Sequence, residues 1–256
     1  MLTESEINSL LELAKMAGGV IMEVYNDPGN FGVEIKDDNS PLTRADKASH
    51  KVIAKGLKDL FPEIPVLSEE GKDISYMERK KWDTFWLVDP LDGTKEFIKR
   101  NDEFTVNIAL IKDGYPDFGI VYLPVDDVLY YGGAFYRSFK RINEESRTIQ
   151  VSKKQNDRIA MRSRSHGSPE EQEVYDTYGV TDFKSAGSAL KFCYVAEGAA
   201  DLYYRHGPTM EWDSAAGQAV IEGAGGMVLD QLGPDRFSYN KEVLLNGSFL
   251  VLGFDQ

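Results

Sequence analysis

The sequence contains a single cysteine, Cys193, among 256 residues, so no internal disulfide can form. Phe192 and Tyr194 flank this cysteine, which predicts a packed thiol rather than a reactive one. No apolar run approaches the ~18 residues that a membrane-spanning helix needs. These absences exclude a disulfide scaffold and a transmembrane segment. They predict a cytoplasmic location, with a peripheral position at the inner membrane as the alternative.

Basic residues are fewer than acidic residues in this sequence. The chain has 29 Lys and Arg residues against 42 Asp and Glu residues, a net charge of −13. This balance argues against nucleic-acid binding, which needs a basic face. The first ten residues, MLTESEINSL, lack a basic region followed by an apolar core, so no signal peptide is predicted. If the substrate is an anion, bound divalent cations would screen its repulsion from the protein.

Hydrophobic periodicity predicts a mixed α/β fold, because helical and strand patterns alternate along the chain. We expect helices at residues 3–25, 43–60, 169–178, 188–197 and 211–223, and strands at 64–68, 85–89, 158–163 and around Leu202 and Val228. Residues 103–111 and 118–124 have strand composition and are separated by KDGYPD, which predicts an antiparallel hairpin.

A charged segment divides the chain. Residues 141–158 hold eight charged residues and no aromatic residue. We interpret this segment as the seam between an N-terminal subdomain, residues 1–145, and a C-terminal subdomain, residues 146–256. The apolar content of 42% is sufficient for one large domain or for two tightly joined ones.

The stretch WLVDPLDGTKEF places two acids, Asp89 and Asp92, directly after an apolar run. Pro90 has no N–H group, so the strand is expected to end there. Gly93 and Thr94 resemble the entrance to a short helix. A strand end with paired acids and a helix start is a plausible place for metal ions and an anion. A surface turn is the alternative, since Pro, Asp and Gly all favour turns.

Three further acids stand out, and each also has a purely structural interpretation. Asp46, in SPLTRAD, could be a helix acid that interacts favourably with the dipole. Glu69, in VLSEEG, could be solvent-exposed, and Asp213, in EWDSAAG, could cap a helix. Taken together the structural interpretations weaken, because Glu69 and Asp89 both end apolar runs that could be neighbours in one sheet. Their side chains would then emerge beside Asp213.

Carboxylates without clustered His or Cys suit a hard cation such as Mg²⁺ rather than zinc. Mg²⁺ held by a few acids keeps waters and accepts phosphate oxygens, which favours phosphoryl transfer to water. Other phosphatase designs do not fit. The chain has no Walker A loop, and its paired acids are three apart rather than two. Ala199 stands where a Cys-x5-Arg phosphatase would need arginine. The predicted nucleophile is therefore water.

These motifs resemble a known family. DPLDGT, with SEE upstream and WDSAAG downstream, is similar to the inositol monophosphatase superfamily of metal-dependent, lithium-inhibited phosphatases. The longer set, including SRSH, LKF, VAEG and GPT, resembles its 3′(2′),5′-bisphosphate nucleotidase branch of the CysQ type. The resemblance implies a layered αβαβα sandwich of the inositol monophosphatase and fructose-1,6-bisphosphatase type. It also implies hydrolysis of the 3′-phosphate of adenosine 3′,5′-bisphosphate to AMP, a reaction tied to sulfate assimilation.

The resemblance also implies roles for individual residues around two or three Mg²⁺ ions. One ion would be held by Glu69, Asp89 and the Leu91 carbonyl, and a second by Asp89, Asp92 and Asp213. Thr94, supported by Asp46, would orient the attacking water. The backbone N–H groups of Gly93 and Thr94 would bind the phosphate, so that the substrate-binding set includes Glu69, Leu91, Asp92, Gly93, Thr94 and Asp213.

Substrate recognition is expected in the C-terminal half. MRSRSH resembles the nucleotide-contact loop of the family, which nominates Ser163 and His166. The alternative is that His166 merely leads into a helix capped by the following residues. Lys191 falls in the first turn of a predicted helix, where a cation opposes the dipole and is best tolerated beside an anion. A lysine extending along the surface is the alternative. Gly187 would let substrate approach the backbone.

Two other functions compete with the nucleotidase. The nearer one is an inositol-phosphate or sugar-phosphate phosphatase with the same metal centre. The other is a regulatory protein that has kept the fold and acts by contacting a partner, although intact ligand positions argue against it. The expected partner is the small-molecule substrate, and the sequence does not fix the oligomeric state.

Overall fold

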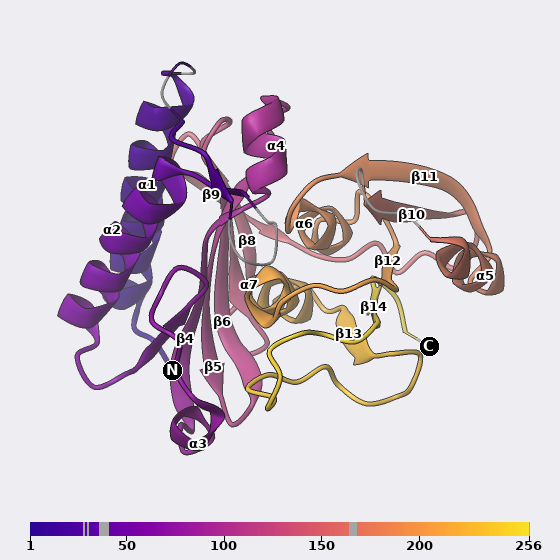
Figure 1. Ribbon diagram of the computed structural model, residues 1–256. Helices are drawn as coiled ribbons and strands as arrows, with labels where there is room; N and C mark the ends of the chain where they lie inside the picture. Colours follow the sequence, from indigo (N-terminus) through magenta and orange to yellow (C-terminus); the bar gives the residue numbers. More distant parts are fainter. Residues whose placement is uncertain (28, 30, 36–40, 164–167, 256) are drawn as a thin grey trace.

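In the computed structural model, helices and sheets alternate in five layers (Figure 1). The structure describes all residues except 28, 30, 36–40, 164–167 and 256. Helices α1 (Glu4–Tyr25) and α2 (Arg44–Leu60) cover one face of a seven-stranded sheet. Helices α6 (Leu190–Ala196) and α7 (Glu211–Gly223) lie between this sheet and a five-stranded sheet, and α5 (Pro169–Thr177) packs on the second sheet's other side. This order confirms the predicted layered αβαβα sandwich.

The two helices of the outer layer begin with the same capping arrangement. The Glu6 carboxylate accepts a hydrogen bond from the Thr3 backbone N–H at 2.7 Å, just before α1. The Asp46 carboxylate does the same for the Thr43 N–H at 2.8 Å, just before α2. Each bond satisfies a donor that the helix itself leaves without a partner. The start of α2, and with it Asp46, is thereby fixed.

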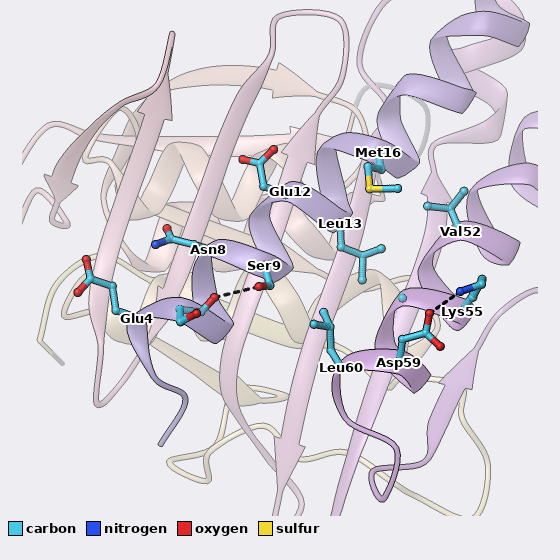
Figure 2. A pocket seen from close by; sticks show the side chains of 12 residues that line it. Glu4, Asn8, Ser9, Glu12, Leu13, Met16, Val52, Lys55, Asp59 and Leu60 are labelled. Carbon is cyan, nitrogen blue, oxygen red and sulfur yellow. Dashed lines mark hydrogen bonds and ion pairs between the residues drawn. The ribbon is translucent and has the colours of Figure 1, made fainter.

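A groove of about 920 Å³ lies between α1 and α2 (Figure 2). Its lining is mainly apolar and includes Leu13, Met16 and Leu60. Lys55 and Asp59 form an ion pair at its edge. None of the residues that line this groove is among the sequence-predicted site residues.

The first sheet contains the predicted hairpin and extends further than the sequence suggested. Its strands, in spatial order, are β3 (Val66–Ser68), β4 (Thr84–Asp92), β5 (Thr105–Lys112), β6 (Tyr115–Leu123), β7 (Val128–Gly133), β8 (Arg137–Ile142) and β9 (Glu145–Ile149). The pair β3–β4 is parallel and the other neighbours are antiparallel, which confirms the β5–β6 hairpin. The charged segment 141–158 includes the end of β8 and all of β9, which sequence patterning missed. The β9 strand lies at the sheet edge, where exposed charged side chains are expected.

Smaller elements connect these strands. A two-stranded ribbon pairs β1 (Glu34–Ile35) with β2 (Pro41–Leu42), before α2. A short helix α3 (Tyr76–Arg79) lies between β3 and β4, and α4 (Thr94–Lys99) follows β4 directly. The predicted entrance to a short helix at Gly93 and Thr94 is thus confirmed.

The prediction that the strand ends at Pro90 is wrong. Strand β4 continues to Asp92, with its register against β5 shifted between Asp89 and Asp92. Asp89 pairs with Asn107, whereas Asp92 pairs with Thr105, so the β4 side of this interval has one extra residue. A bulge accommodates a proline because the bulged strand does not use every N–H in the ladder. The proline therefore bends the strand without ending it.

The second sheet contains the remaining predicted strands. In spatial order they are β11 (Val180–Ala186), β10 (Arg158–Ser163), β12 (Leu202–Arg205), β14 (Phe249–Leu252) and β13 (Met227–Asp230). The predicted strands at 158–163, around Leu202 and around Val228 are confirmed, and so are the three predicted helices of this half. Strands β11 and β14 were missed.

Helix α7 lies at the centre of the molecule and packs against both sheets (Figure 1). It approaches β6 closely at Gly119, where a Cβ atom would lie 2.5 Å from the Ala216 carbonyl oxygen. Cys193 is buried in the same core, as predicted, and burial raises the pKa of its thiol. Within the described ranges, no helix is long and apolar enough to cross a membrane. Packing against both sheets fixes the body of α7, and the first turn of the helix carries Asp213.

Candidate active site

Two parallel strands bring the first pair of acids together. Strand β3 pairs with β4 so that Ser68 lies opposite Val88, and each acid comes one residue later, Glu69 and Asp89. The Glu69 backbone N–H donates to the Val88 carbonyl oxygen at 3.1 Å, which continues the ladder to this point. The parallel register therefore places Glu69 beside Asp89, although β4 itself continues to Asp92. The predicted neighbourhood of these two strands is confirmed.

The bulge in β4 positions the second acid of the motif. The Leu91 backbone N–H donates to the Asp89 carboxylate at 3.0 Å, which tightens the turn around Pro90. The Asn107 side-chain amide on β5 donates to the Asp92 carboxylate at 3.2 Å. Thr105 in turn donates to the Asn107 side-chain oxygen at 3.0 Å, which orients the amide. Sequence reasoning missed Asn107, whose only signal was a polar side chain in an apolar strand.

Helix α7 brings in the acid from the other half of the chain. Asp213 is the third residue of α7, and its carboxylate accepts a hydrogen bond from the Met210 N–H at 2.7 Å. Carboxylate oxygens of Asp89, Asp92 and Asp213 all lie within 4.8 Å of one another. Asp213 is therefore both an acid at a helix start, as the structural interpretation predicted, and a member of the acidic cluster.

These carboxylates strongly disfavour one another's ionisation. Desolvation raises the pKa of Asp89 well above its usual range, and the charges of Glu69, Asp92 and Asp213 raise it further. Desolvation also raises the pKa of Asp92, to about 6, although the nearby Lys191 ammonium opposes the shift. The pKa of Asp213 is raised by desolvation and by the charge of Asp92. Such a group of acids is stable in its ionised form only beside positive charge.

Asp46 and Thr94 meet at the edge of this cluster. Asp46 uses one carboxylate oxygen to accept hydrogen bonds from the Thr43 N–H and hydroxyl, at 2.8 and 2.5 Å. The Thr94 hydroxyl lies 3.1 Å from the other oxygen, to which it donates. Burial raises the pKa of Asp46, and the Thr43 hydrogen bonds oppose this. One residue thus both caps α2 and holds the hydroxyl at the start of α4.

A cavity of about 290 Å³ opens beside the acids. The sequence-predicted residues that line it are Asp92, Gly93, Ser163, Gly187, Lys191 and Asp213. His166, the other predicted recognition residue, lies outside the described residues. Arg205 also lines the cavity, and its guanidinium donates to the Gly207 and Pro208 carbonyl oxygens at 3.1 and 3.3 Å. Sequence reasoning missed Arg205, which lies at the end of an apolar strand and belongs to no motif considered there.

Lys191 is buried, so it does not extend along the surface. It is in the first turn of α6, as predicted, and its ammonium donates to the carbonyl oxygens of Ala186 and Ser188. The partial negative charge on those carbonyl oxygens offsets part of the unfavourable interaction between the ammonium and the positive end of the helix dipole. Burial lowers the pKa of Lys191, and the negative charge of Asp92 opposes this. The lysine therefore presents positive charge to the same cavity that the acids border.

Close contacts with neighbouring residues of the protein require a glycine at position 187. A Cβ atom there would lie 2.8 Å from the Glu96 side chain and 2.9 Å from the Glu103 carbonyl oxygen. The Gly187 N–H donates to the Glu103 carboxylate at 2.8 Å. These contacts give the glycine a structural reason in addition to the predicted close approach of a substrate.

The donor set fits a hard divalent cation. It consists of the carboxylate oxygens of Asp89, Asp92 and Asp213, and no His or Cys joins the cluster within the described part of the chain. Carboxylate and carbonyl oxygens are the ligands that Mg²⁺ prefers. A cation there would also offset the repulsion that raises the pKa values of the acids.

Comparison with known proteins agrees with this architecture. The sequence profile of the inositol monophosphatase family matches residues 3–251. A 3′(2′),5′-bisphosphate nucleotidase CysQ from Escherichia coli (strain K12) is 46% identical over 96% of this chain and 98% of its own. The crystal structure of CysQ from Bacteroides thetaiotaomicron superimposes with a TM-score of 0.86 at 41% identity, covering 98% of both chains. A Thermotoga maritima IMPase, at 22% identity, shares the fold with a TM-score of 0.80 over 97% of this chain and 92% of its own.

The raised pKa values predict how pH and Mg²⁺ together affect stability. Between the ordinary aspartate pKa of about 4 and the raised values, the folded state holds more protons than the unfolded state, so these groups lower stability as pH rises. Bound Mg²⁺ should remove this loss. We expect the rise in melting temperature on adding Mg²⁺ to grow from about pH 5 to about pH 8. Thermal melts at several pH values measure it, with Na⁺ at equal ionic strength as the control, and an increment independent of pH would contradict the assignment.

Proposed function

The chain belongs to the inositol monophosphatase family, and we propose that it hydrolyses the 3′-phosphate of adenosine 3′,5′-bisphosphate to give AMP and phosphate. The observation that carries the proposal is one cavity lined both by members of the acidic cluster, Asp92 and Asp213, and by two cations, Lys191 and Arg205. A substrate with two phosphate groups could place one phosphate at the acids, through bound cations, and the other at Lys191 and Arg205. The name of the relative at 46% identity, a 3′(2′),5′-bisphosphate nucleotidase CysQ, supports the same activity, and the solved structure at 41% identity is also a CysQ.

The acids would hold Mg²⁺ ions, two or three in number. Glu69, Asp89 and the Leu91 carbonyl would form one ligand set, and Asp89, Asp92 and Asp213 would form the other. When bound, the ions supply Lewis-acid activation of water and neutralise charge on the phosphate. Asp89 belongs to both sets, which agrees with its central position among the repelling charges.

Thr94 and Asp46 would act on the attacking water. The Thr94 hydroxyl lies 3.1 Å from an Asp46 carboxylate oxygen and 3.3 Å from the Leu91 carbonyl oxygen, and when it donates to Asp46 its lone pairs can accept a hydrogen bond from water. Asp46 is itself held by two hydrogen bonds from Thr43, so the acceptor stays in place. The backbone N–H groups of Gly93 and Thr94, at the start of α4, would bind the phosphate oxygens.

Lys191 and Arg205 would bind the phosphate that is not hydrolysed. Lys191 is tethered by two backbone carbonyls and Arg205 by two others, so both cations are held in place before substrate arrives. Preorganised charge costs little ordering entropy on binding. Ser163 lines the same cavity and would contact the nucleotide, together with His166. A cytoplasmic location stays a prediction, as does the peripheral membrane alternative.

A panel of substrates tests the proposed activity directly. We expect phosphate release from adenosine 3′,5′-bisphosphate with a higher kcat/KM than from inositol 1-phosphate or a simple sugar phosphate. The activity should require Mg²⁺, and lithium should inhibit it. Preference for inositol phosphate would favour the competing phosphatase, and release in excess chelator after metal stripping would contradict the metal-dependent reaction.

Lys191→Met supplies the matched variant for this panel, because it keeps most of the aliphatic part of the side chain and removes its charge. A charge-assisted contact contributes roughly 1.5–3 kcal/mol, so kcat/KM for the bisphosphate should fall by about one to two powers of ten. A small phosphomonoester has no second phosphate and should lose much less. Equal losses for the two substrates would mean that Lys191 does not bind the second phosphate.

A double-mutant cycle tests the pairing of Thr94 with Asp46. Thr94→Ala and Asp46→Asn should each lower kcat by ~10²–10⁴-fold while changing KM little, because their task concerns the attacking water. If the two act through their shared hydrogen bond, the double variant should be little slower than either single variant. Steady-state rates of the four proteins measure this. Losses that multiply would show that the two residues act independently.

A further inference from the structure

The C-terminal segment 238–246 lies against the first turn of α7. The Asn246 N–H donates to the Thr209 carbonyl oxygen at 2.8 Å, and the Glu211 N–H donates to the Leu244 carbonyl oxygen at 3.0 Å. Met210 forms an isolated antiparallel bridge with Leu245 between these bonds. We call residues 238–246 the anchor segment. It contacts the residues just before Asp213 although it lies some way along the chain from them.

The Asn246 side chain bonds to residues on both sides of Asp213. It is 4% exposed, and its amide nitrogen lies 2.8 Å from the Met210 carbonyl oxygen. The same nitrogen lies 3.1 Å from the hydroxyl oxygens of Thr209 and Ser214. A side-chain amide has two N–H donors, so these three acceptors use all of its donor capacity. Asn246 thus ties the residues that precede Asp213 to the residue that follows it.

Glu211 fastens the anchor segment to α7 through a carboxylate that is fully buried. One carboxylate oxygen accepts from the Asn240 N–H at 2.7 Å. The other accepts from the Lys241 N–H at 2.9 Å and lies 2.8 Å from the Lys241 ammonium. The remaining side of the segment is held by Arg79 of α3, which donates to the carbonyl oxygens of Lys241 and Glu242 at 2.5 and 2.7 Å. The segment is therefore bonded both to the first turn of α7 and to an element of the first half of the chain.

This arrangement bears on the acidic cluster because Asp213 belongs to a group that repels it. Carboxylate oxygens of Asp89, Asp92 and Asp213 lie within 4.8 Å of one another, so negative charges on Asp89 and Asp92 repel the Asp213 carboxylate. Asp213 is near the end of a helix, where a shift of the first turn would be the easiest relaxation. Groups that orient a metal ligand commonly affect metal affinity by 10–100-fold without touching the metal.

We propose that Asn246, fastened through the anchor segment to Glu211 and Arg79, is a positioning residue that holds Asp213 in place for cation binding. The inference rests on the proposed Mg²⁺ site. It predicts that loss of the Asn246 amide weakens Mg²⁺ binding more than its effect on overall stability would suggest.

The test compares Asn246→Ala with a matched control on the same helix. Arg236 pairs with Glu222 near the other end of α7, at 2.6 Å, and it also comes from the C-terminal part of the chain. Arg236→Gln removes an attachment of α7 that is remote from Asp213. Isothermal titration of Mg²⁺ into the metal-free full chain gives the dissociation constant, and thermal melts without metal give the stability of each variant.

We expect Asn246→Ala to raise the Mg²⁺ dissociation constant about 10–100-fold, whereas Arg236→Gln should change it less than about twofold at a comparable loss of melting temperature. An unchanged Mg²⁺ affinity in Asn246→Ala, or an equal loss in both variants, would overturn the inference. If Asn246→Ala shows no cooperative melt, Arg79→Lys replaces it and should raise the dissociation constant more than Arg236→Gln does. No Mg²⁺ binding by the unsubstituted chain would overturn the proposed metal site itself, whereas intact binding in the variants would overturn only the role of Asn246.

Discussion

Mutual repulsion among carboxylates is the constraint around which this structure is organised. Asp89 is buried, and Glu69, Asp92 and Asp213 all lie close enough to raise its pKa. Such a cluster is unfavourable on its own, since each acid is desolvated and faces like charge. Its acids come from the ends of two strands and from the start of a helix. The surrounding fold holds these ends in place, and a divalent cation would attract each carboxylate and so offset their repulsion.

The layered sandwich supplies that rigidity from several directions. The parallel pairing of β3 with β4 sets Glu69 beside Asp89, and the bulge after Asp89 turns Asp92 toward Asn107. Helix α7 is packed between the two sheets, and the anchor segment bonds to its first turn, which carries Asp213. Lys191, Arg205, Asp92 and Asp213 line one small cavity, so positive charge lies close to the acids. An anionic substrate can therefore approach a protein whose net charge is strongly negative.

Much of this could be predicted from sequence because its signals are local. The acids of DPLDGT follow an apolar run, and Asp213 lies just before the small residues of a predicted helix, so both could be found without the fold. Pro90 led to the wrong prediction that the strand ends there, because a bulge tolerates a proline that a regular ladder would exclude. Arg205 and Asn246 could not be found, since their importance depends on contacts made across the tertiary structure. Edge strand β9 was missed because exposed charged strands resemble a linker.

The central claim is that these carboxylates destabilise the protein until a cation binds, and Asp89→Asn tests it most directly. The asparagine side chain keeps the shape and can still accept the Leu91 hydrogen bond, but it cannot be charged. Thermal melts of the metal-free chain and of the Mg²⁺-loaded chain, near neutral pH, should show opposite effects. The account predicts that the variant melts higher than the unsubstituted chain without metal and gains little from Mg²⁺. A variant that melts lower without metal, and is still stabilised fully by Mg²⁺, would contradict it.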